Sequence, residues 1–248
     1  MPSLADNTLI LTGASMGIGR AVALGLAREG VDLVLNARSR EPLQDIAYQC
    51  LKHNVRVKVV AGDISLAKTV EACVEQAKAM GDMTGFIHCA GILHPGAFLW
   101  ELDEESFSQV MGSNVQAAFL LIRYAVPALM ARKSGLAVFV GSGAADIIQP
   151  GIGAYCAAKT AEEQLAKQLA AETDALTCFV FRPGIVDTRM QAQARQAQGG
   201  AAKHLHQVFR PWKERGELIT PEQSAGSLIQ LLKEEGKKLH GGIFRAGE

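Results

Sequence analysis

Short apolar runs alternate along this chain with longer stretches in which apolar residues recur at helical spacing. The runs predict seven strands, at 9–11, 33–35, 55–61, 86–87, 137–140, 177–181 and 243–244. The stretches between them predict helices at about 18–29, 41–53, 66–80, 104–132, 153–173 and 221–235. Because the runs are apolar almost throughout, both faces of each strand should be covered. The alternation predicts an α/β, doubly wound fold with a parallel seven-stranded sheet between two layers of helices.

Glycines and irregular stretches indicate where these elements end. Gly30, Gly81 and Gly135 stand near predicted helix ends, where a left-handed residue is favoured. The segment 184–216 is the least regular, and we expect it to form a loop over the substrate. No repeat, linker or shift in composition divides the chain, which predicts one domain over residues 1–248.

Composition and charge narrow the possible partners. The 25 Lys and Arg residues balance the 25 Asp and Glu residues, so no excess positive charge favours a nucleic acid. The first residues lack the pattern of a signal peptide, and we expect no apolar run to reach the roughly 18 to 20 residues that span a bilayer. We expect a cytoplasmic protein without membrane contact.

The metal-ligating residue types show no metal-site spacing. Five cysteines are widely separated along the chain, which favours buried, reduced thiols. His204 and His206 lie two residues apart in the segment expected to be a loop, without a nearby acidic or thiol partner. We therefore expect solvated surface histidines and no metal.

A glycine-rich turn follows the first predicted strand and leads into the first predicted helix. Gly13 permits a tight turn, Gly17 permits close approach of a pyrophosphate, and Gly19 permits close packing of the helix. The phosphates would meet free N–H groups at the helix N-terminus, with Ser15 and Ile18 also in contact. The pattern favours a dinucleotide site over an ordinary βα turn.

The end of the second strand indicates which dinucleotide is bound. NAD-binding proteins commonly carry an acid there, whereas this chain has Arg38 and Ser39, which suit the 2′-phosphate of NADP(H). An exposed loop arginine is the alternative. After the third strand, Asp63 and Ile64 are placed to contact adenine, although Asp63 could equally cap the helix that follows.

Carbonyl reduction needs a proton donor, and one helix carries a suitable pair. Tyr155 and Lys159 are four residues apart, so they share a helix face, and the ammonium can lower the pKa of the phenol. Ser142 follows the fifth strand, at the carboxyl edge where parallel sheets bind ligands.

These motifs together resemble the short-chain dehydrogenase/reductase family, whose order and spacing they follow over almost the whole chain. The residues shared with that family are those of the glycine-rich turn and of the predicted catalytic and cofactor positions. They are residues 12–19, Asn114, Ser142, Tyr155, Lys159, Pro183, Gly184, Ile185 and Thr188. The resemblance implies a Rossmann-like sheet on which Tyr155 is the acid/base and Lys159 binds the nicotinamide ribose. It also implies that Ser142 bonds the substrate oxygen and that Asn114 holds a water that relays protons through Lys159.

The segment 183–188 completes the implied cofactor site. In the family, the residues corresponding to Pro183, Gly184, Ile185 and Thr188 contact the nicotinamide and its phosphate. Taken singly, several site residues have a structural alternative: Asn114 as a helix kink or cap, Thr188 as a turn residue, and Ser142 as a strand-end hydroxyl.

The chain departs from the family pattern after the fourth strand. Two asparagines are common there before Ala90 and Gly91, but this chain has His88 and Cys89. The backbone at Ala90 and Gly91 should still approach the cofactor. We expect His88 to be a hydrogen-bonded core residue and Cys89 to be an inert thiol.

The carboxyl end resembles the sepiapterin reductase and benzil reductase branch of the family. Enzymes of that branch reduce ketones and diketones with NADPH. Sepiapterin reductases anchor the pterin with an acid on the last strand, where this chain has Arg245, so a pterin substrate is not indicated.

The sequence therefore predicts an NADPH-dependent carbonyl reductase of a ketone or diketone. The alternatives are a 3-oxoacyl reductase of fatty acid synthesis, an NAD(P)-dependent alcohol dehydrogenase, or a non-catalytic dinucleotide sensor or scaffold. By analogy with the family, we expect a homodimer or homotetramer with contacts through the helices near 104–132 and 153–173.

Overall fold

The computed structural model describes residues 4–5, 7–234 and 236–247. Its strands are β1 (Thr8–Thr12), β2 (Asp32–Ala37), β3 (Val57–Ala61), β4 (Met83–His88), β5 (Leu136–Val140), β6 (Thr177–Arg182) and β7 (Ile243–Arg245). All pair in parallel, in the order β3-β2-β1-β4-β5-β6-β7. The order reverses direction between β1 and β4, and such a switch point is where open α/β sheets bind ligands. The predicted Rossmann-like fold is confirmed.

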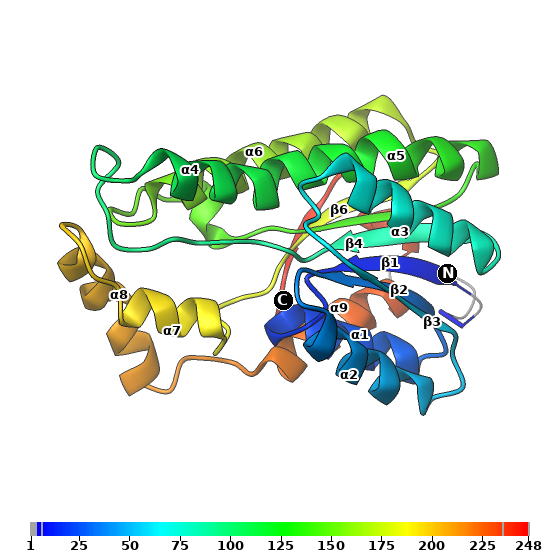
Figure 1. Ribbon diagram of the computed structural model, residues 1–248, viewed down its shortest axis with the longest axis horizontal. Helices are drawn as coiled ribbons and strands as arrows, with labels where there is room; N and C mark the ends of the chain where they lie inside the picture. The colour runs from blue at the N-terminus through cyan, green and yellow to red at the C-terminus, as the bar shows by residue number, and fades with distance from the viewer. Residues whose placement is uncertain (1–3, 6, 235, 248) are drawn as a thin grey trace.

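Helices cover both faces of the sheet (Figure 1). The α-helices are α1 (Gly17–Arg28), α2 (Arg40–Leu51), α3 (Ala67–Ala79), α4 (Glu104–Met111), α5 (Ala117–Arg132), α6 (Gly153–Glu172), α7 (Arg189–Arg195), α8 (Ala202–Glu214) and α9 (Pro221–Glu234). One face packs against α1, α2 and α9, and the other packs against α3, α5 and α6. In Figure 1, α7 and α8 lie beyond the end of the sheet at which β6 finishes.

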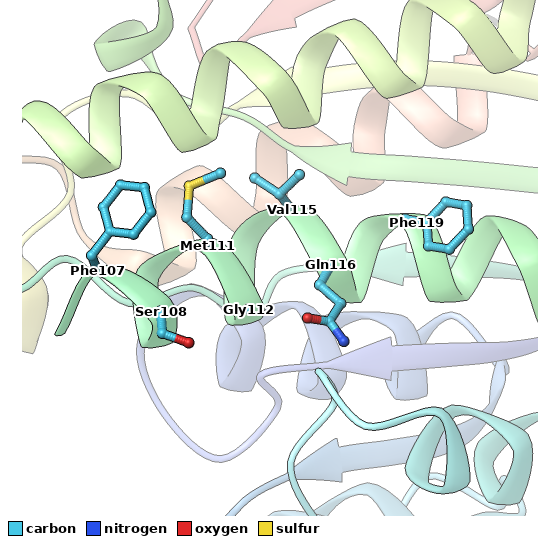
Figure 2. Close-up of a pocket in the computed structure, with 7 residues that line it drawn as sticks. All are labelled: Phe107, Ser108, Met111, Gly112, Val115, Gln116 and Phe119. Atoms are coloured by element: carbon cyan, nitrogen blue, oxygen red, sulfur yellow. The ribbon is translucent and has the colours of Figure 1, made fainter. Parts of the chain in front are cut away.

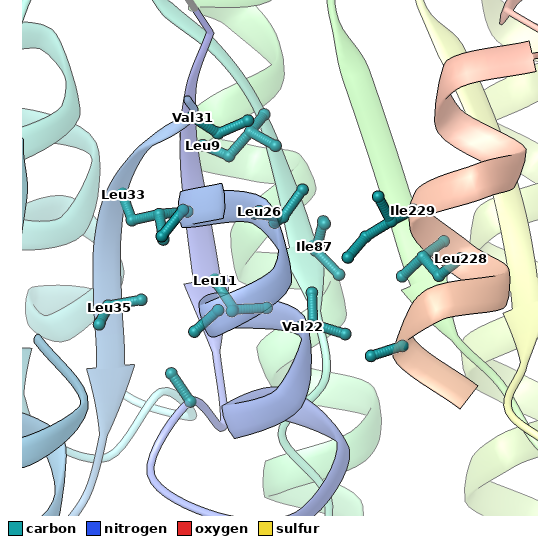
Figure 3. Close-up of a cluster of buried hydrophobic side chains, with 14 of the residues drawn as sticks. Leu9, Leu11, Val22, Leu26, Val31, Leu33, Leu35, Ile87, Leu228 and Ile229 are labelled. Carbon is teal, nitrogen blue, oxygen red and sulfur yellow. The ribbon is translucent and has the colours of Figure 1, made fainter. Parts of the chain in front are cut away.

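Alternate residues of each strand enter different cores. Leu9 and Leu11 of β1 join the cluster under α1 and α9, whereas Ile10 joins the cluster under α3 and α5. Figure 3 shows Leu9 and Leu11 in the first cluster, together with Val22 of α1 and Leu228 of α9. Burial of apolar side chains on both faces explains why the strands read as continuous apolar runs.

The segment 184–216 is more regular than expected. It contains α7 and α8, so the expectation of a long irregular loop is wrong for most of its length. His204 and His206 lie on α8 rather than in a loop. His204 is exposed, but His206 is half-buried, with its Nε2 3.0 Å from the carbonyl oxygen of Ala197. Small and polar residues in this stretch hid a helical pattern.

The predicted helix at 104–132 is continuous but not uniform. A π-helical turn, η1 (Gly112–Gln116), joins α4 to α5. The whole span Glu104–Arg132 has an apolar window with mean hydropathy 1.3, of which 44% is buried. By length and composition it could cross a membrane, which corrects the expectation that no stretch is apolar enough, although core helices of soluble proteins meet the same criteria.

One of the three predicted glycine helix ends is wrong. Gly30 and Gly81 adopt positive φ angles, of 80° and 127°. After α5, however, Lys133 takes the left-handed conformation, with φ of 55°, two residues before Gly135. A lysine fits there because its backbone N–H still closes the last helical turn on the carbonyl of Met130.

Candidate active site

The residues singled out in the sequence converge on the carboxyl edge of the sheet. The glycine turn follows β1, Arg38 follows β2 and Asp63 follows β3. Gly91 follows β4, and Ser142 follows β5. Parallel strands bring all these ends to one side of the sheet (Figure 1). The fold therefore gathers the candidate site from segments far apart in the sequence.

The glycine turn is shaped by close contacts that a side chain would block. Gly13 has φ of 68°, and a methyl group there would lie 2.8 Å from the Cα of Ala90. A methyl group at Gly19 would lie 2.2 Å from the carbonyl oxygen of Gly13. At Gly17, with φ of 54°, the nearest atom is the Thr188 methyl carbon, at 3.5 Å. Gly13 and Gly19 thus serve packing, and Gly17 leaves room on the side facing Thr188.

The N-terminus of α1 fits a pyrophosphate. Met16 is its N-cap residue and makes no side-chain capping bond, and the first turn carries no acidic residue. N–H groups without an intrahelical acceptor, together with the positive end of the helix dipole, favour an anion. Ser15 and Ile18 flank this helix end, and both are half-buried. The site can hold the phosphates of a dinucleotide.

The end of β2 presents cationic and hydroxyl groups rather than an acid. Arg38 and Ser39 are exposed, and the Arg38 side chain makes no hydrogen bond or ion pair to another described residue. Ser39 is the N-cap residue of α2 but forms no side-chain capping bond. Asn36 is buried and donates to the carbonyl oxygens of Val60 and Gly62. Arg38 and Ser39 are therefore available to a 2′-phosphate.

Asp63 and Ile64 play different parts after β3. The Asp63 carboxylate accepts bonds from the backbone N–H of Ser65 at 2.9 Å and from its hydroxyl at 2.7 Å. The N-cap residue of α3 is Leu66, so Asp63 shapes the preceding turn and is not itself the helix cap. The side chain of Ile64 is 4% exposed and packs in the core. Contact of these two residues with adenine stays a prediction.

Tyr155, Lys159 and Ser142 lie together. Both α6 residues are buried, with Tyr155 8% and Lys159 4% exposed. The Lys159 Nζ lies 5.8 Å from the centre of the Tyr155 ring. The Ser142 side chain is close enough to the phenol to lower its pKa, and its hydroxyl oxygen accepts from the backbone N–H of Ala144 at 3.1 Å. The predicted spacing thus brings a phenol, an ammonium and a hydroxyl together.

The pKa of Tyr155 is raised, in contrast to the expected lowering. Burial raises it most, and the negative charge of Glu162 raises it further. The positive charge of Lys159 and the nearby Ser142 side chain lower the pKa of Tyr155, but their effect is smaller. Because the phenol stays protonated at neutral pH, it suits a proton donor.

Asn114 lies at the π-helical turn, in the kink that was its structural alternative. Its side-chain amide donates to Val110 O at 2.8 Å and to Ile92 O at 3.0 Å. The backbone N–H of Ala117 bonds to Gly112, five residues back. The buried Oδ1 of Asn114 has no partner among the described residues, and π-helical turns often mark functional sites.

Gly91 brings Asn114 and Lys159 to one point. A methyl group at Gly91 would lie 2.7 Å from the Asn114 Oδ1 and 3.9 Å from the Lys159 Nζ. Only a residue without a side chain fits between these groups. The acceptor oxygen of Asn114 and the ammonium of Lys159 therefore both lie near the point where a side chain at position 91 would begin.

Lys159 forms a buried ion pair with Glu162. Its Nζ donates to the Glu162 Oε2 at 2.6 Å and to the carbonyl oxygen of Val140 at 2.8 Å. The side chains are 5% and 0% exposed. Burial raises the pKa of Glu162 to about 7, against the pull of Lys159, and Glu162 keeps the pKa of Lys159 above its usual value against the effect of burial.

A second ion pair fixes the backbone at Ser142. Both carboxylate oxygens of Glu163 accept bonds from Arg182, at 2.9 and 2.7 Å, and Oε1 also accepts from the backbone N–H of Ser142 at 3.1 Å. Arg182 also bonds to both carboxylate oxygens of Asp146. The network joins β6, α6 and the turn after β5, so it fixes the backbone from which the Ser142 side chain projects.

His88 occupies the core, as expected. It is 0% exposed, and its Nδ1 lies 2.9 Å from the Thr12 hydroxyl. That hydroxyl accepts from the backbone N–H groups of Cys89 and Ala90, both at 3.1 Å, so its own proton faces Nδ1. Nε2 therefore carries the ring proton. Burial, helped by Lys159, lowers the pKa of His88 to about 3.

The segment after β6 starts at the carboxyl edge of the sheet, where the candidate cofactor site lies. Gly184 has φ of 81°, and the carbonyl oxygen of Pro183 accepts the Ser224 hydroxyl at 2.8 Å. Ile185 accepts from the backbone N–H of Ile219 at 3.0 Å. Thr188 caps α7 by accepting from Gln191. Thr188 is thus a helix cap rather than the turn residue given as its structural alternative, and its methyl group faces Gly17, so its cofactor contact stays a prediction.

The segment 184–216, which was expected to lie over the substrate, contacts the segment 93–101 that follows β4. The backbone N–H of Ala201 donates to the carbonyl oxygen of Gly96 at 2.9 Å, and Glu101 accepts from the N–H of Gly200 at 3.2 Å. Phe98 stacks on Trp100 with ring centres 4.6 Å apart. Trp100 is 81% exposed, so an aromatic surface borders this region.

The cysteines and the acidic residues form no metal cluster in the described part of the chain. All five cysteines there are free thiols. Burial raises the pKa of Cys89 to about 12, so it is a poor nucleophile at neutral pH.

Sequence reasoning missed three charged residues of the site. Glu162, Glu163 and Arg182 received no role, although all three are buried and paired. A signal was present, since Glu162 and Glu163 follow Lys159 by three and four residues and so share its helix face. Acids on the face of α6 that meets the sheet must have partners.

Comparison with known proteins agrees with this geometry. A family model described as short chain dehydrogenase matches residues 7–199. An uncharacterized oxidoreductase of Schizosaccharomyces pombe is 31% identical, over 97% of this chain and 96% of its own. The NADPH-dependent pterin aldehyde reductase of Arabidopsis thaliana is 27% identical, over 90% of this chain and 91% of its own.

A solved structure extends the comparison. The L-sorbose reductase of Gluconobacter frateurii, complexed with NADPH and L-sorbose, has a TM-score of 0.83 and 26% identity. The match covers 97% of this chain and 95% of that one. This chain therefore belongs to the short-chain dehydrogenase/reductase family, oxidoreductases that use a nicotinamide dinucleotide.

Proposed function

We propose that this protein is an NADPH-dependent carbonyl reductase that acts on a ketone or diketone. The observation that carries the proposal is the meeting of Tyr155, Lys159 and Ser142 beside the glycine turn. The dinucleotide supplies hydride for the carbonyl carbon. Negative charge then develops on the carbonyl oxygen, which needs a proton and a hydrogen-bond donor.

Each residue contributes a defined part. Tyr155, protonated at neutral pH, donates the proton. The Ser142 hydroxyl, held by Glu163 through the backbone, orients the substrate oxygen. Lys159 has one N–H beyond those given to Val140 and Glu162, and it serves the nicotinamide ribose. Asn114 offers its Oδ1 to a water that leads protons toward Lys159.

The remaining predicted residues hold the cofactor. Arg38 and Ser39 meet the 2′-phosphate, and the N-terminus of α1 meets the pyrophosphate. The absence of an acid at the end of β2 supports NADPH over NADH. The names of two relatives mention NADPH, in agreement with this preference.

The experiment measures NADPH consumption against a panel of ketones and diketones. We expect turnover with at least one of them, and Tyr155→Phe should lower kcat by at least about a hundredfold. Tyr48→Phe is the matched control, since Tyr48 is 66% exposed on α2 and has no part in the proposed site. Full activity of Tyr155→Phe would refute the mechanism. Binding of NADPH without turnover of any panel member would favour a dinucleotide sensor.

We also propose that the active form pairs two copies through α4 and α5. An open groove of about 430 Å³ runs along this helix surface, with Phe107 and Phe119 45% and 50% exposed. Figure 2 shows these two rings on the same side of the helix as Met111 and Val115. A second copy would bury these apolar side chains, which supports a homodimer or a homotetramer.

A further inference from the structure

The buried carboxylate of Glu162 is a charged group that the proposed chemistry does not use directly. Its Oε2 lies 2.6 Å from the Lys159 Nζ, and its side chain is 0% exposed. Its Oε1 has no hydrogen-bond partner among the described residues. A carboxylate so enclosed is held chiefly by one cation, and that cation is the neighbour of the proton donor.

The ion pair determines where the Lys159 ammonium lies. Two of its three N–H donors are taken, by Glu162 and by the carbonyl oxygen of Val140 at the end of β5. The pair therefore leaves one donor to face the phenol and the cofactor. Glu162 stands seven residues after Tyr155, so all three side chains share one face of α6.

The same pair weakens the field that Lys159 exerts on Tyr155. A lone buried ammonium near a phenol favours the ionised form of the phenol. A carboxylate in contact with that ammonium opposes this effect, because the two charges nearly cancel at the distance of the ring. The raised pKa of Tyr155 has the Glu162 charge among its causes.

We propose that Glu162 is a positioning residue that fixes Lys159 and offsets its charge, so that Tyr155 is kept as the proton-donating acid that reduction requires. The inference rests on the proposed reductase function for its meaning. The site then consists of three neighbouring groups, in which the Lys159 ammonium lies near both the Tyr155 phenol and the Glu162 carboxylate. It also predicts that the charge at Glu162 raises the pH up to which Tyr155 stays protonated and can donate to a carbonyl oxygen.

Other titratable groups lie near the side chains of Tyr155, Lys159 and Glu162, and their charges could also affect the titration of Tyr155. Within α6 they are Cys156 and Glu163, and from the end of β4 they are His88 and Cys89. Arg182 and Asp146 reach these side chains through Glu163. The pKa of His88 is lowered to about 3 and that of Cys89 is raised to about 12, so both groups are neutral at neutral and mildly alkaline pH. Arg182 contacts the Glu163 carboxylate at 2.7 Å.

The test is a titration of Tyr155 that needs neither substrate nor cofactor. Tyrosinate is followed by ultraviolet difference absorption as the pH rises, and Tyr155→Phe identifies the contribution of Tyr155. Glu162→Gln should lower the pKa of Tyr155 by about one unit. Glu162→Asp keeps the charge and should restore most of the wild-type value. Glu172→Gln removes a charge from the exposed end of the same helix and should change nothing.

A structural role alone makes the opposite prediction. Glu162→Gln would then lower the melting temperature and leave the Tyr155 titration unchanged, which would overturn the proposal. Glu162→Met is a second neutral variant, whose side chain places no amide group in the buried site. We expect it to lower the pKa of Tyr155 by the same amount. If neither neutral variant folds, as judged by circular dichroism, the ion pair is structural and the proposal is wrong.

The pH profile of catalysis gives a second readout. For ketone reduction with NADPH, the alkaline limb of kcat/KM should move to lower pH in Glu162→Gln by the same amount as the titration. A protein that reduces no ketone fails the proposed function, whereas the spectroscopic titration still decides the role of Glu162. The two failures are therefore distinguishable.

Discussion

Single residues decide which cofactor this site accepts and how its core responds to acid. Arg38 is exposed at the end of β2, with no described ion-pair partner and no acid at the position that NAD-binding proteins commonly use. A guanidinium can bind a phosphate bidentately, whereas NADH offers it only ribose hydroxyls. The contribution of Arg38 should therefore depend on the 2′-phosphate.

Replacing Arg38 separates the two dinucleotides. Arg38→Ala should raise the KM for NADPH by about tenfold to a hundredfold, the loss expected for a charged hydrogen bond. The KM for NADH should change by less than about twofold. Arg40→Ala, an exposed arginine two residues on, is the control. Equal loss for NADPH and NADH in Arg38→Ala would show that Arg38 does not contact the phosphate.

His88 makes stability depend on pH. Its pKa is lowered from 6.5 to about 3 in the folded protein, mainly by burial. Below the pKa that His88 has in the unfolded chain, the unfolded state binds a proton that the native state does not bind. The free energy of unfolding therefore falls as the pH approaches the lower pKa of His88 in the folded protein. The expected decline from this residue between about pH 7 and about pH 4 is roughly 3 kcal/mol.

Urea unfolding at several pH values measures this decline. His88→Asn, which restores a residue common in the family, should flatten the acid side of the stability profile. His53→Asn, at an exposed histidine, should leave the profile unchanged. An equally steep decline in His88→Asn would show that other groups cause the acid sensitivity.

At the scale of elements, the turn between β1 and α1 carries a combined conformational and steric constraint. Gly13 and Gly216 both have φ of 68°. Only at Gly13 do backbone atoms lie within 3 Å of the place that an alanine methyl group would take, whereas nothing lies within 4 Å of that place at Gly216. The two sites thus separate the left-handed conformation from the contact with Ala90.

Alanine at these two glycines tests that separation. Gly216→Ala should cost about 1 kcal/mol, from the backbone conformation alone. Gly13→Ala should cost more, by about 1 to 3 kcal/mol, and should also weaken NADPH binding because the turn must shift. Thermal unfolding and NADPH titration measure both effects. Equal destabilisation of the two variants would show that the contact at Ala90 does not constrain the turn.

The order of the elements was predictable, but some local geometry was not. Apolar runs and helical spacing predicted the seven strands and the described α-helices other than α7 and α8, with α4 and α5 expected as one helix, because sheet burial leaves a strong pattern. The helices α7 and α8 were missed, since Gly199 and Gly200 interrupt that stretch. The π-helical turn depends on the Asn114 amide reaching Val110, which no spacing rule reveals.

The site was predictable as a set of positions but not as a set of charges. Tyr155, Lys159 and Ser142 meet as their spacing indicated. Lys159 lowers the pKa of Tyr155 as expected, but the net shift is upward, because burial and Glu162 outweigh Lys159. The partners of the buried acids could not be predicted, because they come from other segments of the chain. Arg182 of β6, for example, pairs with Glu163 of α6.

At the scale of the whole molecule, one sheet carries every segment of the candidate site, which supports a single catalytic domain over residues 1–248.

A substitution on the surface of α4 and α5 tests the proposed assembly. Phe119→Lys should convert the dimer to a monomer or weaken it at least about tenfold, because a charge would enter an apolar contact. Light scattering after gel filtration measures the mass. Tyr48→Lys, at an exposed residue on α2, is the control.

A wild-type mass of one chain would contradict the proposed dimer, and an unchanged mass in Phe119→Lys would move the contact elsewhere. Neither result would affect the chemistry, because every residue proposed to act on the carbonyl comes from one copy. The assembly and the reaction are thus separate claims about this fold.

The central claim is that this chain transfers hydride from NADPH to a carbonyl carbon while Tyr155 supplies the proton. The most direct test uses NADPH deuterated at the nicotinamide carbon that releases hydride, with a diketone or ketone that the panel identifies. We predict deuterium at the new carbinol carbon of the product by mass spectrometry, and at least about a hundredfold less labelled product with Tyr155→Phe over the same time. Product without deuterium at that carbon, or an equal amount of labelled product with Tyr155→Phe, would contradict the account.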